Sequence, residues 1–204
     1  MPTTYAHYKF GKEVLSALPR PLQNSIEAHR ELFDIGLHGP DILFYYNALK
    51  KDPVNEQGHT LHEQFADEFF HHAVEVIEKA KDPAAARAYI YGFICHFALD
   101  SECHPYVEKI MQVGRVSHNE IEMELDRMML TEDYHDPLRY LTAKHIQPKM
   151  EYAEVIAPFF KDVTAEQIYK ALKGMVFYHK LFLAPTSGKR KALFLGMKAV
   201  GKYD

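Results

Sequence analysis

The stretch from about Pro83 to Cys103 constrains the fold most, because it combines helical spacing with almost continuous apolar side chains. A helix that is apolar on nearly every side must be covered by other elements. We therefore expect this segment to form a buried helix within a larger assembly. Pro105 disfavours helical conformation at His104, so the helix is predicted to end there.

The rest of the chain also has helical apolar spacing, and strand signals are almost absent. Phe10, Val14 and Leu18, for example, recur at every fourth position before Pro19. A break is expected at Gly36–Pro40, with a new helix from Asp41. The other helices are predicted over 5–18, 21–33, 59–80, 118–130, 137–146, 149–161 and 164–183. Capping boxes are predicted at Ser117/Glu120 and Thr164/Gln167. The sequence thus predicts an all-α, single-domain multi-helix bundle over 1–204, with its motifs in about 5–130 and further helices in 137–204.

Composition and charge exclude several classes of protein. The net charge of −4 argues against a general nucleic-acid binder, so no stable nucleic-acid partner is expected. No secretory leader and no run of about 18 apolar residues is visible, which predicts a cytoplasmic protein. Cys95 and Cys103 are too far apart along one helix to form a disulfide.

The apolar segment contains two residues that are costly to bury. His96 and Asp100 are four positions apart, so both side chains lie on one face of the helix, with His104 one turn further on. A buried carboxylate requires a partner or a metal ion. A hydrogen-bonded His–Asp pair in the core would explain the pattern as well as a zinc site would.

Other residues of the same chemistry occur elsewhere among the thirteen histidines. His118 and Glu122 repeat the four-residue spacing, although a solvated surface pair would look the same. Asp41 follows a Gly-Pro turn, and an N-terminal helical carboxylate is favoured by the helix dipole alone. The remaining histidines of this kind are His7, His59 and His62. Together these residues offer ligands from several helices, as a metal site in a bundle core requires. We predict that these residues bind a cluster of divalent ions, with zinc as the first candidate.

The order of these motifs resembles the zinc-dependent phospholipase C family, whose all-helical three-zinc core is shared with the S1/P1 nucleases. The matching elements are His7, GPDILFYY (Asp41), GHTLHE (His62), YIYGFICHFALDSECHPYVE (His96, Asp100, His104) and SHNEIEMELD (His118, Glu122). The resemblance covers about residues 5–127 and leaves the C-terminal third unmatched.

The resemblance implies a ligand set for two or three zinc ions. Asp41, His62, His96 and Asp100 would hold one ion, Asp100 and His7 a second, and His104, His118 and Glu122 a third. His62 fits the family pattern better than His59. Secreted members use an N-terminal Trp as a further ligand. This sequence has no Trp, so the ion near His7 lacks a ligand.

The expected activity is hydrolysis of a phospholipid or other small phosphodiester, with Asp41 as the catalytic residue that orients or deprotonates water. No acidic residue precedes His7, and Ile42 replaces an aromatic of the secreted lipases, so the resemblance supports a metal core better than a phosphatidylcholine substrate. One alternative is a nuclease-like phosphodiesterase, with Phe44, Tyr45 and Tyr46 as candidate stacking residues, although their place on a helix beside other apolar residues favours the core for most of them. The other is a zinc-binding protein without turnover.

The basic C-terminal tail suggests one more partner. Lys189, Arg190 and Lys191 precede ALFLGMKAV, a pattern compatible with peripheral contact at an anionic membrane surface. An ordinary final helix packed on the core would give the same sequence.

Overall fold

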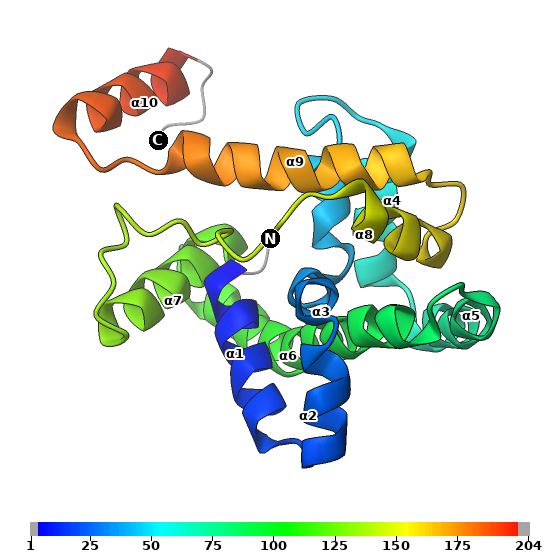
Figure 1. Ribbon diagram of the computed structural model, residues 1–204. Helices are drawn as coiled ribbons and strands as arrows, with labels where there is room; N and C mark the ends of the chain where they lie inside the picture. Colours follow the sequence, from blue (N-terminus) through cyan, green and yellow to red (C-terminus); the bar gives the residue numbers. More distant parts are fainter. Residues whose placement is uncertain (1–3, 200–204) are drawn as a thin grey trace.

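The computed structural model describes residues 4–199 and confirms the all-α prediction: these residues contain helices and turns and no strand (Figure 1). The α-helices are α1 (Thr4–Ala17), α2 (Arg20–Glu27), α3 (Arg30–Gly36), α4 (Pro53–Glu63), α5 (Ala66–Lys79), α6 (Pro83–Val113), α7 (His118–Glu132), α8 (Met150–Ile156), α9 (Ala165–Phe182) and α10 (Ser187–Ala199). Two 3-10 helices, η1 (Gly39–Tyr45) and η2 (Ala157–Phe159), complete the set. The described residues form one bundle with its core around α6.

The predicted apolar helix is α6, the longest element, and it packs against α3 backbone to backbone. A Cβ atom at Gly92 would lie 2.2 Å from the Phe33 carbonyl oxygen, and one at Gly36 would lie 2.1 Å from that of Tyr89. Glycine at both positions therefore permits the close crossing. Because η1 follows α3 directly, this crossing also sets Asp41 beside the middle of α6.

The prediction that Pro105 ends this helix is wrong. Proline removes a backbone donor and costs about 3 kcal/mol inside a helix, yet α6 continues to Val113 and is closed by Gly114, whose N–H donates to the Ile110 carbonyl at 2.7 Å. The continuation buries Val107. It also keeps His104 one turn beyond Asp100 on the same helical face.

Two predicted helices are broken in ways that the apolar spacing did not indicate. The segment 21–33 divides at Ala28–His29 into α2 and α3, and the turn brings α3 against α6. The segment 59–80 divides at Gln64–Phe65, and the first part begins earlier, at Pro53, with an Asp52 capping box. In both places the apolar residues continue at helical spacing, but contacts with other helices interrupt the helix.

Other differences lie in the turns. The helix predicted from Asp41 is the short η1, which ends before Asn47, a residue with φ +47°. Residues 137–146 form successive turns, so that predicted helix is wrong, although Ala143 and Ile146 are buried. The helical spacing of apolar residues in this segment arises because these residues contact the core, although the backbone is not helical. The segment 149–161 is α8 followed by η2.

The predicted capping boxes at Ser117/Glu120 and Thr164/Gln167 are both present, and α1, α7 and α9 begin and end within two residues of their predicted limits. Cys95 and Cys103 are free thiols, as expected. Figure 1 shows α9 as a second long helix, and it contacts both η1 and α8.

Candidate metal centre

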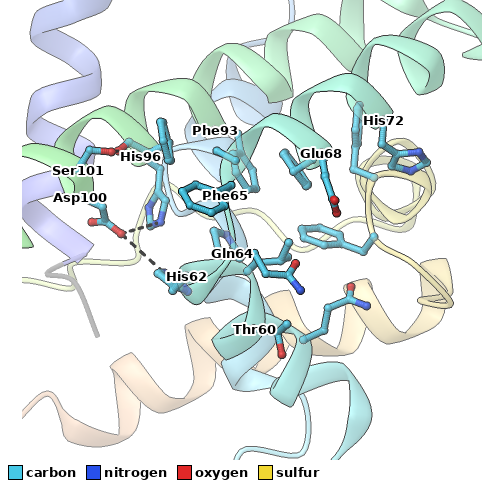
Figure 2. Close-up of a pocket in the computed structure, with 18 of the residues that line it drawn as sticks. Thr60, His62, Gln64, Phe65, Glu68, His72, Phe93, His96, Asp100 and Ser101 are labelled. Carbon is cyan, nitrogen blue, oxygen red and sulfur yellow. Dashed lines mark hydrogen bonds and ion pairs between the residues drawn. The ribbon is translucent and has the colours of Figure 1, made fainter.

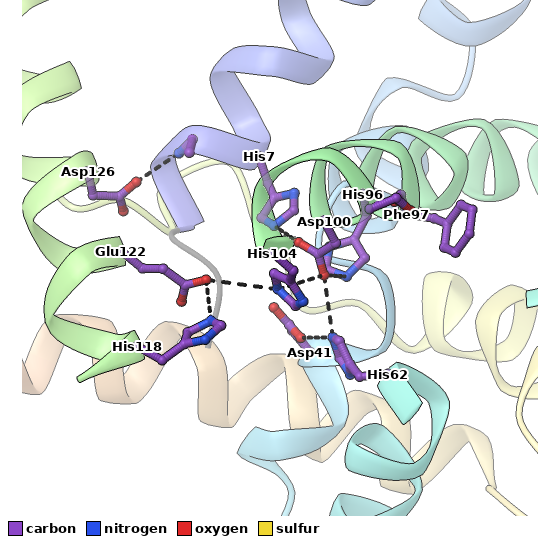
Figure 3. Close-up of polar contacts among 12 residues, drawn as sticks. His7, Asp41, His62, His96, Phe97, Asp100, His104, His118, Glu122 and Asp126 are labelled. Atoms are coloured by element: carbon purple, nitrogen blue, oxygen red, sulfur yellow. Dashed lines mark hydrogen bonds and ion pairs between the residues drawn. The ribbon is translucent and has the colours of Figure 1, made fainter. Parts of the chain in front are cut away.

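The structure brings all eight predicted ligand residues together in the core. They form three groups, His7/His96/Asp100, Asp41/His62/His96 and His104/His118/Glu122, and within each group the ligand atoms lie within 4.8 Å of one another. The side chains come from α1, η1, α4, α6 and α7 and point toward a common centre (Figure 3). Whether each residue binds metal remains a prediction, since convergence alone does not test it.

Asp100 occupies the middle of the arrangement. Its Oδ1 lies 3.1 Å from His7 Nε2, and its Oδ2 lies 3.2 Å from His96 Nε2 and 3.7 Å from His62 Nε2. Burial by itself raises the pKa of Asp100, but the contacts with His7 and His96 hold that pKa well below its usual range. Asp100 is thus a carboxylate whose two oxygens face different histidines, the position that a bridging ligand requires.

Asp41 and His62 form the second contact. Asp41 Oδ1 lies 3.1 Å from His62 Nε2, and His62 Nδ1 lies 2.7 Å from the Gly58 carbonyl oxygen. The carbonyl can only accept, so Nδ1 bears the proton and Nε2 faces the two carboxylates. Burial alone lowers the pKa of His62, but the contacts with Asp41 raise it to about 9.

His59, the alternative to His62, is exposed and lies outside the three groups. Its ring packs on Phe44, with centroids 4.4 Å apart. The turn between α4 and α5 follows His62 directly, so α4 presents only the later histidine to the centre.

His7 is held in place by its neighbours on α7. Asp126 accepts hydrogen bonds from the backbone N–H groups of Tyr5 (3.0 Å) and Ala6 (2.8 Å), at the first turn of α1. The His7 ring stacks on His96 with centroids 4.3 Å apart. Burial and the adjacent His96 lower the pKa of His7, so its ring is neutral and able to donate a lone pair.

Asp126 and Gly39 are site residues that the sequence reasoning missed. Asp126 lies four residues after Glu122 and eight after His118, and this continued spacing was the available signal. Gly39 has φ +48°, and a Cβ atom there would lie 2.3 Å from the His96 ring. Its missing side chain makes room for that ring.

The third group is the most open. His118 Nε2 lies 2.7 Å from Glu122 Oε1, and His104 Nε2 lies 4.0 Å from the same oxygen. The His104 and His118 side chains are about one-third exposed, whereas Glu122 is buried. The Ser117 capping box fixes the first turn of α7, from which His118 projects, and Glu122 follows one turn later on the same face.

Several buried atoms of the centre face one another without forming hydrogen bonds. They are Asp41 Oδ1, His62 Nε2, His96 Nε2, Asp100 Oδ2 and His104 Nε2. Buried polar atoms normally have partners, and lone pairs that converge on a shared space are stabilised by a cation. Imidazole nitrogen and carboxylate oxygen are ligands that zinc accepts, so the donor set fits zinc.

A cavity of about 750 Å³ opens at this centre. Its polar end is formed by His62, His96, Asp100 and His104, and Figure 2 shows Phe65 and Phe93 lying beside these residues. Away from the centre the wall becomes mainly apolar, with Leu61, Phe69, Phe93, Phe97, Phe159 and Phe160. A ligand bound here would meet Asp100 and the histidines at one end, and beyond them a wall of mostly apolar surface that also carries polar residues such as Gln64 and Glu68.

These features define an all-helical protein with candidate metal-binding groups in its core. The family model described as Zinc dependent phospholipase C matches residues 6–174, so the chain belongs to that family. No curated protein and no solved structure matches the chain. Family membership and the histidine–carboxylate groups support a metal-dependent hydrolase at the level of the family. Over residues 4–199, every helix is too short or too polar to cross a bilayer.

Proposed function

We propose that this protein hydrolyses the phosphodiester bond of a phospholipid, or of another small phosphodiester with an apolar leaving group. The supporting observation is the cavity, whose polar end is the candidate metal centre and whose remaining wall is mainly apolar. A phosphodiester of this kind also has a polar and an apolar part, because its charged phosphate is joined to an apolar alcohol.

Zinc ions held by the three groups would neutralise the phosphoryl oxygens and lower the pKa of the attacking water. Asp41 is the proposed catalytic residue, because its buried carboxylate can accept a hydrogen bond from that water and orient it. The Gly58 carbonyl keeps His62 in one tautomer. Phe69, Phe93 and Phe97 would contact the apolar group and exclude water from the polar end.

One observation favours a nuclease-like activity as a second candidate. Phe65 lines the cavity with its side chain 91% exposed, and an exposed ring near a phosphate site can stack on a base. The three aromatics considered for this role do not support it, and Tyr45 and Tyr46 pack against the core. Among the described residues that line the cavity, Phe44, Tyr45 and Tyr46 are absent, and Tyr45 instead contacts His179 through its hydroxyl at 3.0 Å.

A substrate panel tests the proposal. Zinc-loaded protein is assayed on a short-chain choline phosphodiester lipid, on bis-nitrophenyl phosphate and on single-stranded DNA. We expect the lipid to be cleaved with the highest kcat/KM. Preferred cleavage of DNA would establish the nuclease alternative, and no cleavage of any substrate by zinc-loaded protein would contradict the proposed hydrolysis.

Phe97→Ser sharpens the test, because Phe97 lines the apolar wall and is 44% exposed, so the variant should fold. We expect it to lower kcat/KM for the lipid about tenfold, and kcat/KM for bis-nitrophenyl phosphate, whose apolar group is smaller, by less. Leu49→Ser, which changes an exposed side chain outside the cavity, is the matched control.

A further inference from the structure

The C-terminal end of the chain differs in charge from the rest of the molecule. Residues 167–203 contain eight lysines and arginines and no aspartate or glutamate, although the whole chain has a net charge of −4. The family match ends at residue 174, so most of this cationic segment lies beyond it. Such segregation of charge creates a local positive potential on an acidic protein.

α10 belongs to this segment and does not behave as a helix packed on the core. It buries none of its residues. Two of its cations attach it to the end of α9: Lys189 Nζ donates to the Lys180 carbonyl at 3.0 Å, and Arg190 donates to the Ala184 carbonyl at 3.2 Å. α10 therefore folds back beyond the end of α9 and projects from the body of the molecule (Figure 1).

Large apolar side chains are exposed on the same two helices. On α9, Phe177 is 59% and Phe182 is 58% exposed, and on α10 Leu195 is 69% exposed. Three exposed lysines lie close to these side chains in the sequence: Lys180, Lys191 and Lys198. We call this end of the molecule, from Phe177 to Lys198, the α9–α10 hairpin.

We infer that the α9–α10 hairpin docks the protein on an anionic lipid bilayer. A segment whose sequence holds eight cations and no acid matches a negatively charged surface, and each lysine or arginine near such a surface adds to binding. Exposed phenylalanine and leucine can insert at the boundary of headgroups and acyl chains. Cations alone would also suit a nucleic acid, but the apolar side chains favour lipid. The inference goes beyond the proposed hydrolysis, because docking does not require the metal centre.

Vesicle co-sedimentation of the full chain tests the inference. Phosphatidylcholine vesicles that also contain anionic phosphatidylserine are compared with vesicles of pure phosphatidylcholine. We expect pelleting with the anionic vesicles that weakens at high salt. Lys191→Gln/Lys198→Gln should weaken binding about 30-fold, since each charge contributes about a factor of five. These two lysines are chosen because Lys189 and Arg190 attach α10 to α9.

A second variant and two controls separate docking from folding. Leu195→Asp should weaken binding about tenfold or more through lost insertion, whereas Leu49→Asp and Lys50→Gln/Lys51→Gln, on an exposed segment elsewhere, should bind as wild type. Asp100→Asn should also bind as wild type, so loss of hydrolysis and loss of docking are distinguishable. Absence of pelleting, equal pelleting of all variants, or binding of single-stranded DNA in place of vesicles would overturn the inference.

Discussion

Two buried regions of this molecule are rich in histidine, and only one of them has the properties of a metal site. The candidate metal centre combines histidines with Asp41, Asp100 and Glu122. The other region, which we call the neutral histidine group, consists of His38, His145 and His179 and contains no carboxylate of its own. Buried histidines alone therefore do not indicate metal binding; the carboxylates that converge with them do.

The two regions also differ in how their polar atoms are satisfied. In the neutral histidine group, His38 and His145 are hydrogen bonded to each other at 2.7 Å, and His179 contacts the hydroxyl groups of Tyr45 (3.0 Å) and Thr142 (2.9 Å). In the metal centre, Asp41 Oδ1, His62 Nε2, His96 Nε2 and Asp100 Oδ2 converge without hydrogen bonds.

Protonation follows the same division. Burial lowers the pKa of His145 to about 3 and that of His179 to about 4, so both are neutral at pH 7. In contrast, although burial alone would raise the pKa of Asp100, contacts with His7 and His96 hold that pKa well below its usual range, so the metal centre keeps a buried negative charge. The neutral histidine group is thus a structural core, whereas the metal centre holds charge that a cation can balance.

Removing the central carboxylate should have the largest effect. Asp100→Asn removes the charge of the carboxylate that faces four histidines, so we expect loss of bound zinc. Activity should fall by more than the roughly 100-fold that the loss of an outer-shell partner costs. The far-ultraviolet helical signal should remain largely intact. Hydrolysis at the wild-type rate would remove Asp100 from the site.

Asp126→Ala should have a smaller and more local effect. It removes the acceptor of the Tyr5 and Ala6 N–H groups, so α1 and His7 lose their fixed position. We expect a 10- to 100-fold weaker affinity for one zinc ion, with the remaining zinc retained. Isothermal titration with zinc measures this. Glu124→Ala, which removes an exposed acid of the same helix that pairs with Arg127, is the control and should bind zinc as wild type. Equal zinc binding by Asp126→Ala and wild type would contradict the role of Asp126.

His145→Ala tests the neutral histidine group. It removes the hydrogen bond to His38 and the stacking on Tyr8, whose ring centroid is 3.9 Å away. We expect the free energy of unfolding to fall by about 2–4 kcal/mol, while zinc content stays unchanged. Urea denaturation and elemental analysis of the same samples measure both. Loss of zinc in a folded variant would show that the two regions are not separate.

The smallest expected effect concerns pH. Because the folded pKa of His179 is about 4, below the ordinary value of 6.5, the unfolded chain binds a proton that the folded chain does not. Stability from this group is complete above about pH 6.5 and is lost as the pH falls toward 4. We expect a loss of about 2 kcal/mol between pH 7 and 4.5, and a shallower loss in His179→Gln. If the free energy of unfolding falls equally with pH in wild type and His179→Gln, the assignment of this loss to His179 is refuted.

Helical spacing made two pairs visible in the sequence, because it places His96 and Asp100, or His118 and Glu122, on one face. The full set of eight, with His62 in place of His59, came from the order of motifs that resembles the family. The apolar surroundings of Asp100 showed that it must be paired. The breaks after Glu27 and Glu63 could not be predicted, since the apolar period continues through both. They depend on contacts between distant helices, such as the crossing of α3 and α6. Asp126 was missed because its role depends on backbone groups of α1, which the sequence does not place next to α7.

The central claim is that cations balance the converging carboxylates and histidines of the core. A crystal structure of zinc-loaded protein with anomalous scattering at the zinc edge tests it most directly. We expect anomalous peaks within coordination distance of Asp41, Asp100 and Glu122, each also contacted by histidine nitrogen. Protein that takes up no zinc at these positions, or peaks confined to surface histidines such as His71 and His72, would contradict the account.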